Sequence, residues 1–144
     1  MSRLILTYAG PLQVLLLLLL GVTGNLFSDD PLVIAGQILG LAVTVSARIA
    51  FGRQKFNISA TPADGPLLRK GPYRVIRHPM YAGVLLMFIA TVFGHPTILA
   101  AAVLLVDLIV ILWRIQIEEN LLKTTYPDYA EYSLKTTRLI PFIY

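Results

Sequence analysis

The sequence contains no cysteine, which excludes disulfide bonds and thiolate metal sites. Charged residues are also scarce: they make up 14% of the chain, whereas soluble domains usually carry about 25%. No glycine-rich phosphate loop, Ser-His-Asp pattern, internal repeat or low-complexity tail is visible in the sequence. The 144 residues therefore predict one domain over residues 1–144, and an ordinary soluble enzyme is not indicated.

The sequence is rich in long apolar runs. Hydrophobic residues make up 56% of the chain, and the mean hydropathy is +0.72. A helix needs about 20 mostly apolar residues to cross a bilayer. The sequence thus predicts an all-α, polytopic membrane bundle of about four transmembrane helices, with Pro31 and Pro96 in first turns. The predicted spans are residues 4–26, 31–51, 79–94 and 96–117.

The positions of all twelve Lys and Arg residues predict the orientation of these spans. They lie before the first span, in or beside the loop 52–78, and at or after the end of the fourth span in the tail 118–144. The positive-inside rule then places both termini and this loop in the cytoplasm. His78 and His95 fall on opposite sides of the membrane, so no metal site is predicted. The compact size favours a multi-pass protein of a prokaryotic inner (cell) membrane, with the endoplasmic reticulum as the alternative.

The middle loop carries the first candidate residues. Its glycines and prolines punctuate the chain, and it holds His78 with Arg77 beside it and Tyr73 and Tyr81 nearby. A basic loop that contacts anionic lipid headgroups accounts for the arginines. That interpretation leaves the His-Pro pair and the tyrosines unexplained.

The fourth span carries the second group. Arg114 and Glu118 are four residues apart and share a helix face, as a common interfacial ion pair also would. Asp107 lies within about 20° of Glu118 around the helix, which predicts a polar stripe from mid-membrane to the cytoplasmic surface. The simpler interpretation is a protonated Asp107 hydrogen-bonded to Thr44 or Ser46 of the second span.

Taken in order, these blocks resemble the isoprenylcysteine carboxyl methyltransferase family, and the related phospholipid methyltransferases share the first two of them. The blocks cover more than half of the chain. They are Gly71-x-Tyr73-x-x-x-Arg77-His78-Pro79-x-Tyr81-x-Gly83, Arg114-x-x-x-Glu118-Glu119, Tyr126-x-x-Tyr129-x-x-Tyr132 and Ile140-Pro141-Phe142-Ile143.

The resemblance implies a membrane methyltransferase that uses S-adenosylmethionine and releases S-adenosylhomocysteine. It implies that Arg114 faces the methyl acceptor and that Glu119 supports the pocket, as the two catalytic positions. The implied acceptor is a lipophilic or lipidated molecule, with a prenylcysteine-like carboxylate ahead of a phospholipid amine. Membrane lipids are the other expected partners, nucleic acid is not, and the oligomeric state stays open. The implied cofactor-binding residues are Gly65, Pro66, Leu67, Leu68, Tyr73, His78, Pro79, Met80, Tyr81 and Glu118.

Two other classes compete with this interpretation. A non-enzymatic membrane scaffold or anionic-lipid-binding protein would use the basic loop alone, and its lipid binding would fall steeply with salt. A membrane reductase would share the C-terminal region, and it would bind a nicotinamide cofactor in place of S-adenosylmethionine.

Overall fold

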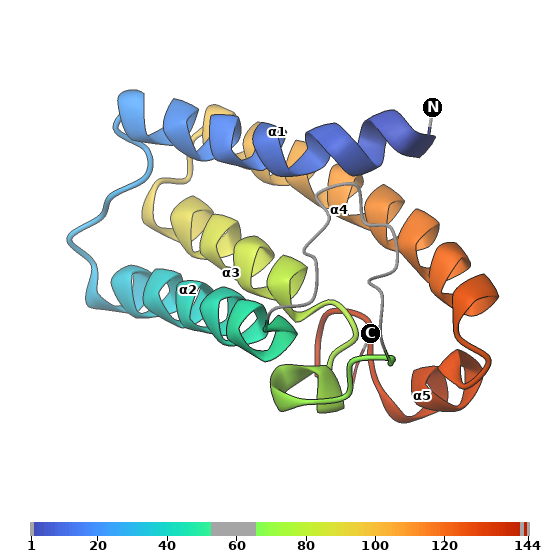
Figure 1. Cartoon of the computed structure of the whole chain (residues 1–144). Helices are drawn as coiled ribbons and strands as arrows, with labels where there is room; N and C mark the ends of the chain where they lie inside the picture. Colours follow the sequence, from blue (N-terminus) through green and yellow to red (C-terminus); the bar gives the residue numbers. More distant parts are fainter. Residues whose placement is uncertain (1, 53–65, 142, 144) are drawn as a thin grey trace.

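The computed structural model describes residues 2–52, 66–141 and 143, with side chains from residue 7 onwards. Within these residues every regular element is a helix, and the single β-type contact is an isolated bridge between Ile76 and Thr137. The predicted all-α class is therefore confirmed for the described chain (Figure 1). The elements are α1 (Ser2–Val22), α2 (Pro31–Phe51), the 3-10 helix η1 (Gly71–Arg74), α3 (Pro79–Gly94), α4 (Ile98–Thr125) and α5 (Tyr129–Lys135).

Two of the four predicted spans match helices, and two have different bounds. The predictions 31–51 and 79–94 coincide with α2 and α3, whereas the first helix ends at Val22 and not at residue 26. α2 and α4 are long and apolar enough to cross a membrane, and α1 and α3 are shorter apolar helices. The count of four spans and the cytoplasmic termini stay predictions.

The helix that contains the predicted fourth span, 96–117, begins and ends later than that span. The helix begins at Ile98 because Thr97 is its N-cap, with a hydroxyl that accepts from the Ala100 amide at 3.1 Å. It continues to Thr125 because most residues from Glu118 to Lys123 are glutamate, leucine or lysine, which favour a helix. It ends where Tyr126 adopts an extended conformation before Pro127. The acidic residues predicted at the start of a tail, Glu118 and Glu119, thus lie within α4.

A close glycine contact holds α2 against α3, the two helices that lie side by side in Figure 1. A Cβ atom at Gly40 would lie 2.5 Å from the carbonyl oxygen of Gly83 and 2.7 Å from Cγ of Met87. The Thr44 hydroxyl donates to the Gly40 carbonyl at 3.0 Å and lies 3.4 Å from the Met80 carbonyl. Small residues let helix backbones approach in membranes, so these contacts fix the start of α3 beside α2.

The interface between α1 and α4 contains a buried polar pair within apolar surroundings. Asp107 is fully buried, and its Oδ1 accepts a hydrogen bond of 2.9 Å from Nε2 of Gln13 in α1. The predicted partners were wrong: Thr44 donates toward the Gly40 and Met80 carbonyls, and Ser46 donates to its own helix. Helix α1 covers this face of α4, and no periodicity in the sequence identifies which helix does so. The neighbouring apolar cluster consists of Leu20, Phe88, Ala100 and Val103.

The C-terminal segment returns to the start of α3, at the end of the bundle where η1 and α5 gather (Figure 1). The Arg77 amide donates to the Thr137 carbonyl at 2.7 Å, and the His78 amide donates to the Arg138 carbonyl at 3.1 Å. Leu139 is buried in the apolar cluster of Leu85, Ile111 and Ile115. The tail therefore packs as part of the core and holds the His-Pro segment in place.

Candidate functional site

His78 lies between two consecutive glutamates of α4. It is the N-cap of α3, is 5% exposed, and is followed by the buried Pro79 at the first helical position. Its Nδ1 lies 3.4 Å from Oε2 of Glu118, and its Nε2 lies 3.6 Å from Oε1 of Glu119. The buried Nε2 atom has no hydrogen-bond partner among the described residues. One imidazole thus joins the two motif blocks that are distant in the sequence.

Glu118 is the meeting point of three side chains. Its Oε1 accepts hydrogen bonds from the Tyr81 hydroxyl and, at 2.9 Å, from Nε of Arg114. The His78 and Tyr81 rings stack with centroids 5.7 Å apart, and the Arg114 guanidinium lies over the Tyr81 ring at 5.4 Å. A carboxylate, an imidazole, a phenol and a guanidinium are therefore concentrated where α3 begins and α4 approaches its end.

Glu119 points into a second ion-pair network. It is 3% exposed and accepts from Nε of Arg77 at 2.9 Å and from Nη2 of Arg138 at 3.1 Å. Arg77 Nη1 also donates to the carbonyls of Ser133, at 2.8 Å, and Thr136. Glu119 therefore fixes the C-terminal segment to α4, which fits a supporting position better than contact with reacting atoms. Arg77 and Arg138 were missed as site residues because their charges alone resemble topogenic arginines.

The surroundings of His78 favour its protonated form. Burial alone would lower its pKa, but the adjacent carboxylates of Glu118 and Glu119 outweigh burial and raise the pKa above its usual value. Burial raises the pKa of Tyr73, and it raises the pKa of Tyr132 to about 12, so both phenols stay neutral. The Tyr132 hydroxyl donates to the Tyr73 carbonyl at 2.7 Å, which ties α5 to η1.

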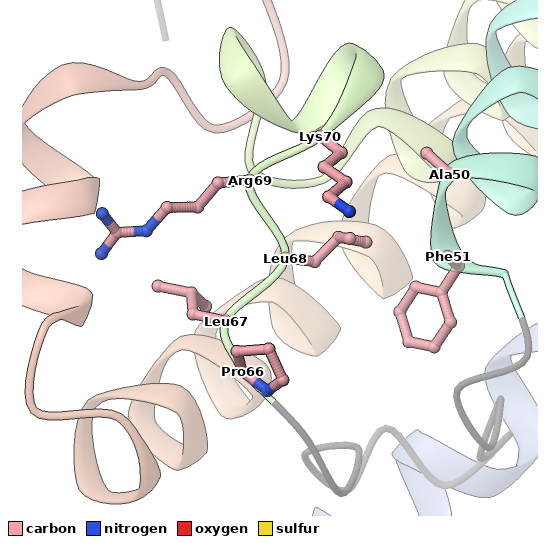
Figure 2. Close-up of a pocket in the computed structure, with 7 residues that line it drawn as sticks. All are labelled: Ala50, Phe51, Pro66, Leu67, Leu68, Arg69 and Lys70. Carbon is pink, nitrogen blue, oxygen red and sulfur yellow. The ribbon is translucent and has the colours of Figure 1, made fainter.

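A cavity of about 240 Å³ lies between the end of α2 and the segment before η1 (Figure 2). Three predicted cofactor residues, Pro66, Leu67 and Leu68, line it, whereas Gly65 lies outside the described residues. The Leu68 and Lys70 side chains point toward α2, and Arg69 points the other way. The other residues that line the cavity are Ala50, Phe51, Arg69 and Lys70.

The predicted site residues consequently fall into two groups. His78, Tyr81, Arg114, Glu118 and Glu119 form one contiguous cluster, none of which lines the cavity. Tyr73 lies beside the cavity wall, with its ring centroid 6.5 Å from that of Phe51. Met80 contributes its carbonyl to the α2–α3 contact.

These features define a helical membrane protein with a buried, charged cluster at one end of its bundle. The sequence model of the family described as phospholipid methyltransferase matches residues 32–129, about two thirds of the chain. The chain therefore belongs to the phospholipid methyltransferase family, and it is a methyltransferase by that membership. The matched segment includes η1, α3, α4 and all of α2 except its first residue, while α1 and Arg138 lie outside it. No curated protein and no solved structure matches the chain significantly.

Proposed function

We propose that this protein transfers a methyl group from S-adenosylmethionine to a lipophilic acceptor, with a prenylcysteine-like carboxylate as the leading acceptor. The observation that carries the proposal is the convergence of His78, Tyr81 and Arg114 on Glu118 within a chain of a methyltransferase family. The first two of the four sequence blocks that carry the family resemblance contribute to this cluster.

The residues present fit the cofactor in chemical type. The Glu118 carboxylate suits an ammonium group or a ribose hydroxyl, and the Tyr81 ring face attracts a sulfonium as it does other cations. The buried Nε2 of His78, without a hydrogen-bond partner in the described chain, adds a polar atom for a ligand. Leu67 and Leu68 offer an apolar wall, and Tyr73, Pro79 and Met80 complete the proposed binding set. When bound, S-adenosylmethionine supplies an electrophilic methyl group on a sulfonium sulfur.

Arg114 is the proposed acceptor-binding residue. A guanidinium can orient a carboxylate through two parallel hydrogen bonds. A carboxylate nucleophile is already an anion, so the protein needs only to align the reactants and exclude water. The raised pKa of His78 supports this acceptor, because a protonated imidazole is a hydrogen-bond donor and not a base. Glu119 is proposed to support the site by holding Arg77 and Arg138.

A phospholipid amine is the second candidate acceptor, and the family description favours it. An amine nucleophile must lose a proton, so this reaction would need a general base. Glu118 or the neutral form of His78 would be that base. The two candidates therefore predict different pH–rate profiles for the same cluster.

Calorimetric titration of the purified full chain with S-adenosylmethionine tests the cofactor. We expect saturable heat from the wild type and an affinity about ten- to a hundred-fold weaker in Glu118→Ala and His78→Ala, since each removes a hydrogen bond to a charged group. The matched control is Glu131→Ala, which removes an exposed carboxylate of α5 that pairs with Lys135. Absence of saturable heat, or unchanged affinity in both site variants, would overturn the proposal.

Transfer of a labelled methyl group distinguishes the acceptors. The purified protein is incubated with labelled cofactor and either a farnesylated cysteine or phosphatidylethanolamine vesicles, and the product is treated with base. A methyl ester releases methanol, whereas a methylated amine does not. If neither acceptor is labelled and binding to anionic vesicles falls steeply with salt, the protein is a lipid-binding scaffold.

A further inference from the structure

The pair formed by Gln13 and Asp107 has no part in the proposed chemistry. Asp107 lies in the N-terminal half of α4, is fully buried, and accepts a hydrogen bond of 2.9 Å from the Gln13 amide. Its other oxygen, Oδ2, is buried without a hydrogen-bond partner among the residues that the structure describes. The apolar cluster of α1, α3 and α4 includes residues one helical turn from the pair, among them Leu17 and Val103.

Such surroundings select the neutral carboxyl group. A carboxylate inside a membrane is costly unless a cation or several donors compensate it, and here one neutral amide donates. A protonated carboxyl group keeps Oδ1 as the acceptor for Gln13 and places a hydrogen on Oδ2. It then has nearly the shape and hydrogen-bonding capacity of an asparagine amide.

The contact between α1 and α4 depends on this pair more than an interface in water would. Lipid tails are as apolar as leucine, so apolar burial does not drive helices together inside a membrane. Van der Waals packing of the α1 leucines also contributes to the contact with α4, but similar aliphatic side chains distinguish neighbouring registers less sharply than a hydrogen bond does. A hydrogen bond is directional, and a shift of one residue would turn the side chain away by about 100°. The Gln13–Asp107 bond therefore fixes the register of the two helices.

Asp107 also shares the buried face of α4 with the proposed site. Arg114 follows it by seven residues and Glu118 by eleven, which are about 10 Å and about 16 Å along the helix axis. Ile111, which is 1% exposed, continues the same face between them. α1, in contrast, precedes the segment 32–129 that the family shares.

From these observations we infer that α1 is a positioning element of the methyl-transfer site and acts through a neutral Asp107–Gln13 pair that sets the placement of α4. The inference rests on the proposed function for the identity of the bound cofactor. The hydrogen bond between Gln13 and Asp107 does not depend on that function. Asp107 and Gln13 are positioning residues, because neither contacts the proposed cofactor or acceptor side chains.

The absence of cysteine provides a direct test. Cysteines introduced at Leu15 of α1 and Leu105 of α4, which are 62% and 58% exposed, can carry spin labels in the full chain in lipid nanodiscs. Electron–electron distance measurements are then made in the wild-type background and in Asp107→Asn, Asp107→Leu and Gln13→Leu. Ser46→Leu is the matched control, since Ser46 is exposed on α2 and bonds within its own helix.

We expect one narrow distance distribution in the wild type, in Ser46→Leu and in Asp107→Asn, and a broadened or shifted one in Asp107→Leu and Gln13→Leu. Affinity for S-adenosylmethionine should fall about ten-fold in the two leucine variants, which is within the usual range of coupling between sites. It should stay within about two-fold of wild type in Asp107→Asn, since the amide replaces a neutral carboxyl group.

Three results would overturn the inference. An unchanged distance in Gln13→Leu, which tests the bond even if Asp107→Leu does not fold, would show that the pair does not fix α1. Equal damage from Asp107→Asn and Asp107→Leu would show that the carboxyl group is ionised. A broadened distance with unchanged cofactor affinity would show that α1 does not position the site. If the wild type binds no S-adenosylmethionine, both the proposed function and the positioning role fail. The spin-label distances would still show whether the Gln13–Asp107 pair fixes α1 against α4.

Discussion

Nδ1 of His78 lies 3.4 Å from Oε2 of Glu118, and this contact joins the N-cap of α3 to the C-terminal part of α4. The two residues are separated by α3, the turn after it and most of α4. Their contact is what brings the two sequence blocks into one site. Because His78 also faces Glu119 at 3.6 Å, its charge is linked to the stability of this end of the bundle.

Stability should depend on pH through His78. Its pKa is raised in the folded protein despite burial, because Glu118 and Glu119 favour the imidazolium. A group whose pKa is higher in the folded than in the unfolded protein stabilises the fold fully when the pH is below its unfolded pKa, here 6.5. That stabilisation is lost as the pH rises through the pKa of the folded protein. The melting temperature of wild type minus that of His78→Gln should therefore be larger at about pH 5.5 than at about pH 9. A difference that is constant, or that grows with pH, contradicts this link.

Replacement of Glu119 should destabilise the fold strongly. In Glu119→Ala, Arg77 keeps a largely buried guanidinium without its carboxylate partner, and breaking a buried ion pair typically costs about 3–5 kcal/mol. Reversible unfolding in detergent measures the change, and Glu131→Ala, which opens the exposed pair with Lys135, should leave the unfolding free energy unchanged. Equal effects of the two variants would rule out a structural role for the Glu119 network.

The glycine contact between α2 and α3 makes a third prediction. A methyl group at Gly83 would collide with the Gly40 carbonyl and with Thr44, so Gly83→Ala should destabilise by about 1–3 kcal/mol. Gly10 of α1 is the matched control, because a Cβ atom there meets nothing within 4 Å. Gly10→Ala should be neutral, or stabilising by up to about 1 kcal/mol, through the higher helix propensity of alanine. The free energies of unfolding of both variants, measured under the same condition, test this prediction. A Gly83→Ala variant as stable as the wild type would show that α2 and α3 do not approach as closely as the structure has them.

The two parts of Tyr81 should contribute separately to cofactor affinity. Tyr81→Phe keeps the ring that stacks with His78 and removes the hydroxyl that bonds Glu118, whereas Tyr81→Leu removes both. Attraction of a cation to an aromatic face is worth about 0.5–2 kcal/mol, so the leucine variant should bind S-adenosylmethionine more weakly than the phenylalanine variant by that amount. Equal calorimetric affinities of the two variants would mean that the ring face does not contact the sulfonium.

Local spacing predicted those features of the site that depend on one helix. Arg114 and Glu118 are four residues apart, and they form the expected bond on one face of α4. The resemblance to membrane methyltransferases also assigned His78 and Glu118 to one predicted site, although 40 positions separate them in the sequence. It could do so because the order of the blocks carries information that composition does not.

Contacts between distant segments that no motif block joins could not be predicted from the sequence. Nothing in the spacing of Asp107 identifies Gln13 as its partner, since an apolar helix offers several neighbours of similar hydropathy. The pairing of Arg77 with Glu119, Ser133 and Thr136 depends on a C-terminal segment that folds back by main-chain hydrogen bonds. These contacts follow from the three-dimensional path of the chain. Arginine, serine and threonine are common in loops, so their presence in the sequence does not indicate such contacts.

An experimental structure of the full chain with S-adenosylmethionine bound tests the central claim most directly. We expect the ligand to lie against His78, Tyr81 and Glu118, with its sulfonium near the Tyr81 ring and its base toward Leu67 and Leu68. Ligand density on a surface remote from the His78–Glu118 contact, or a cluster that excludes the ligand at saturating concentration, would contradict the account.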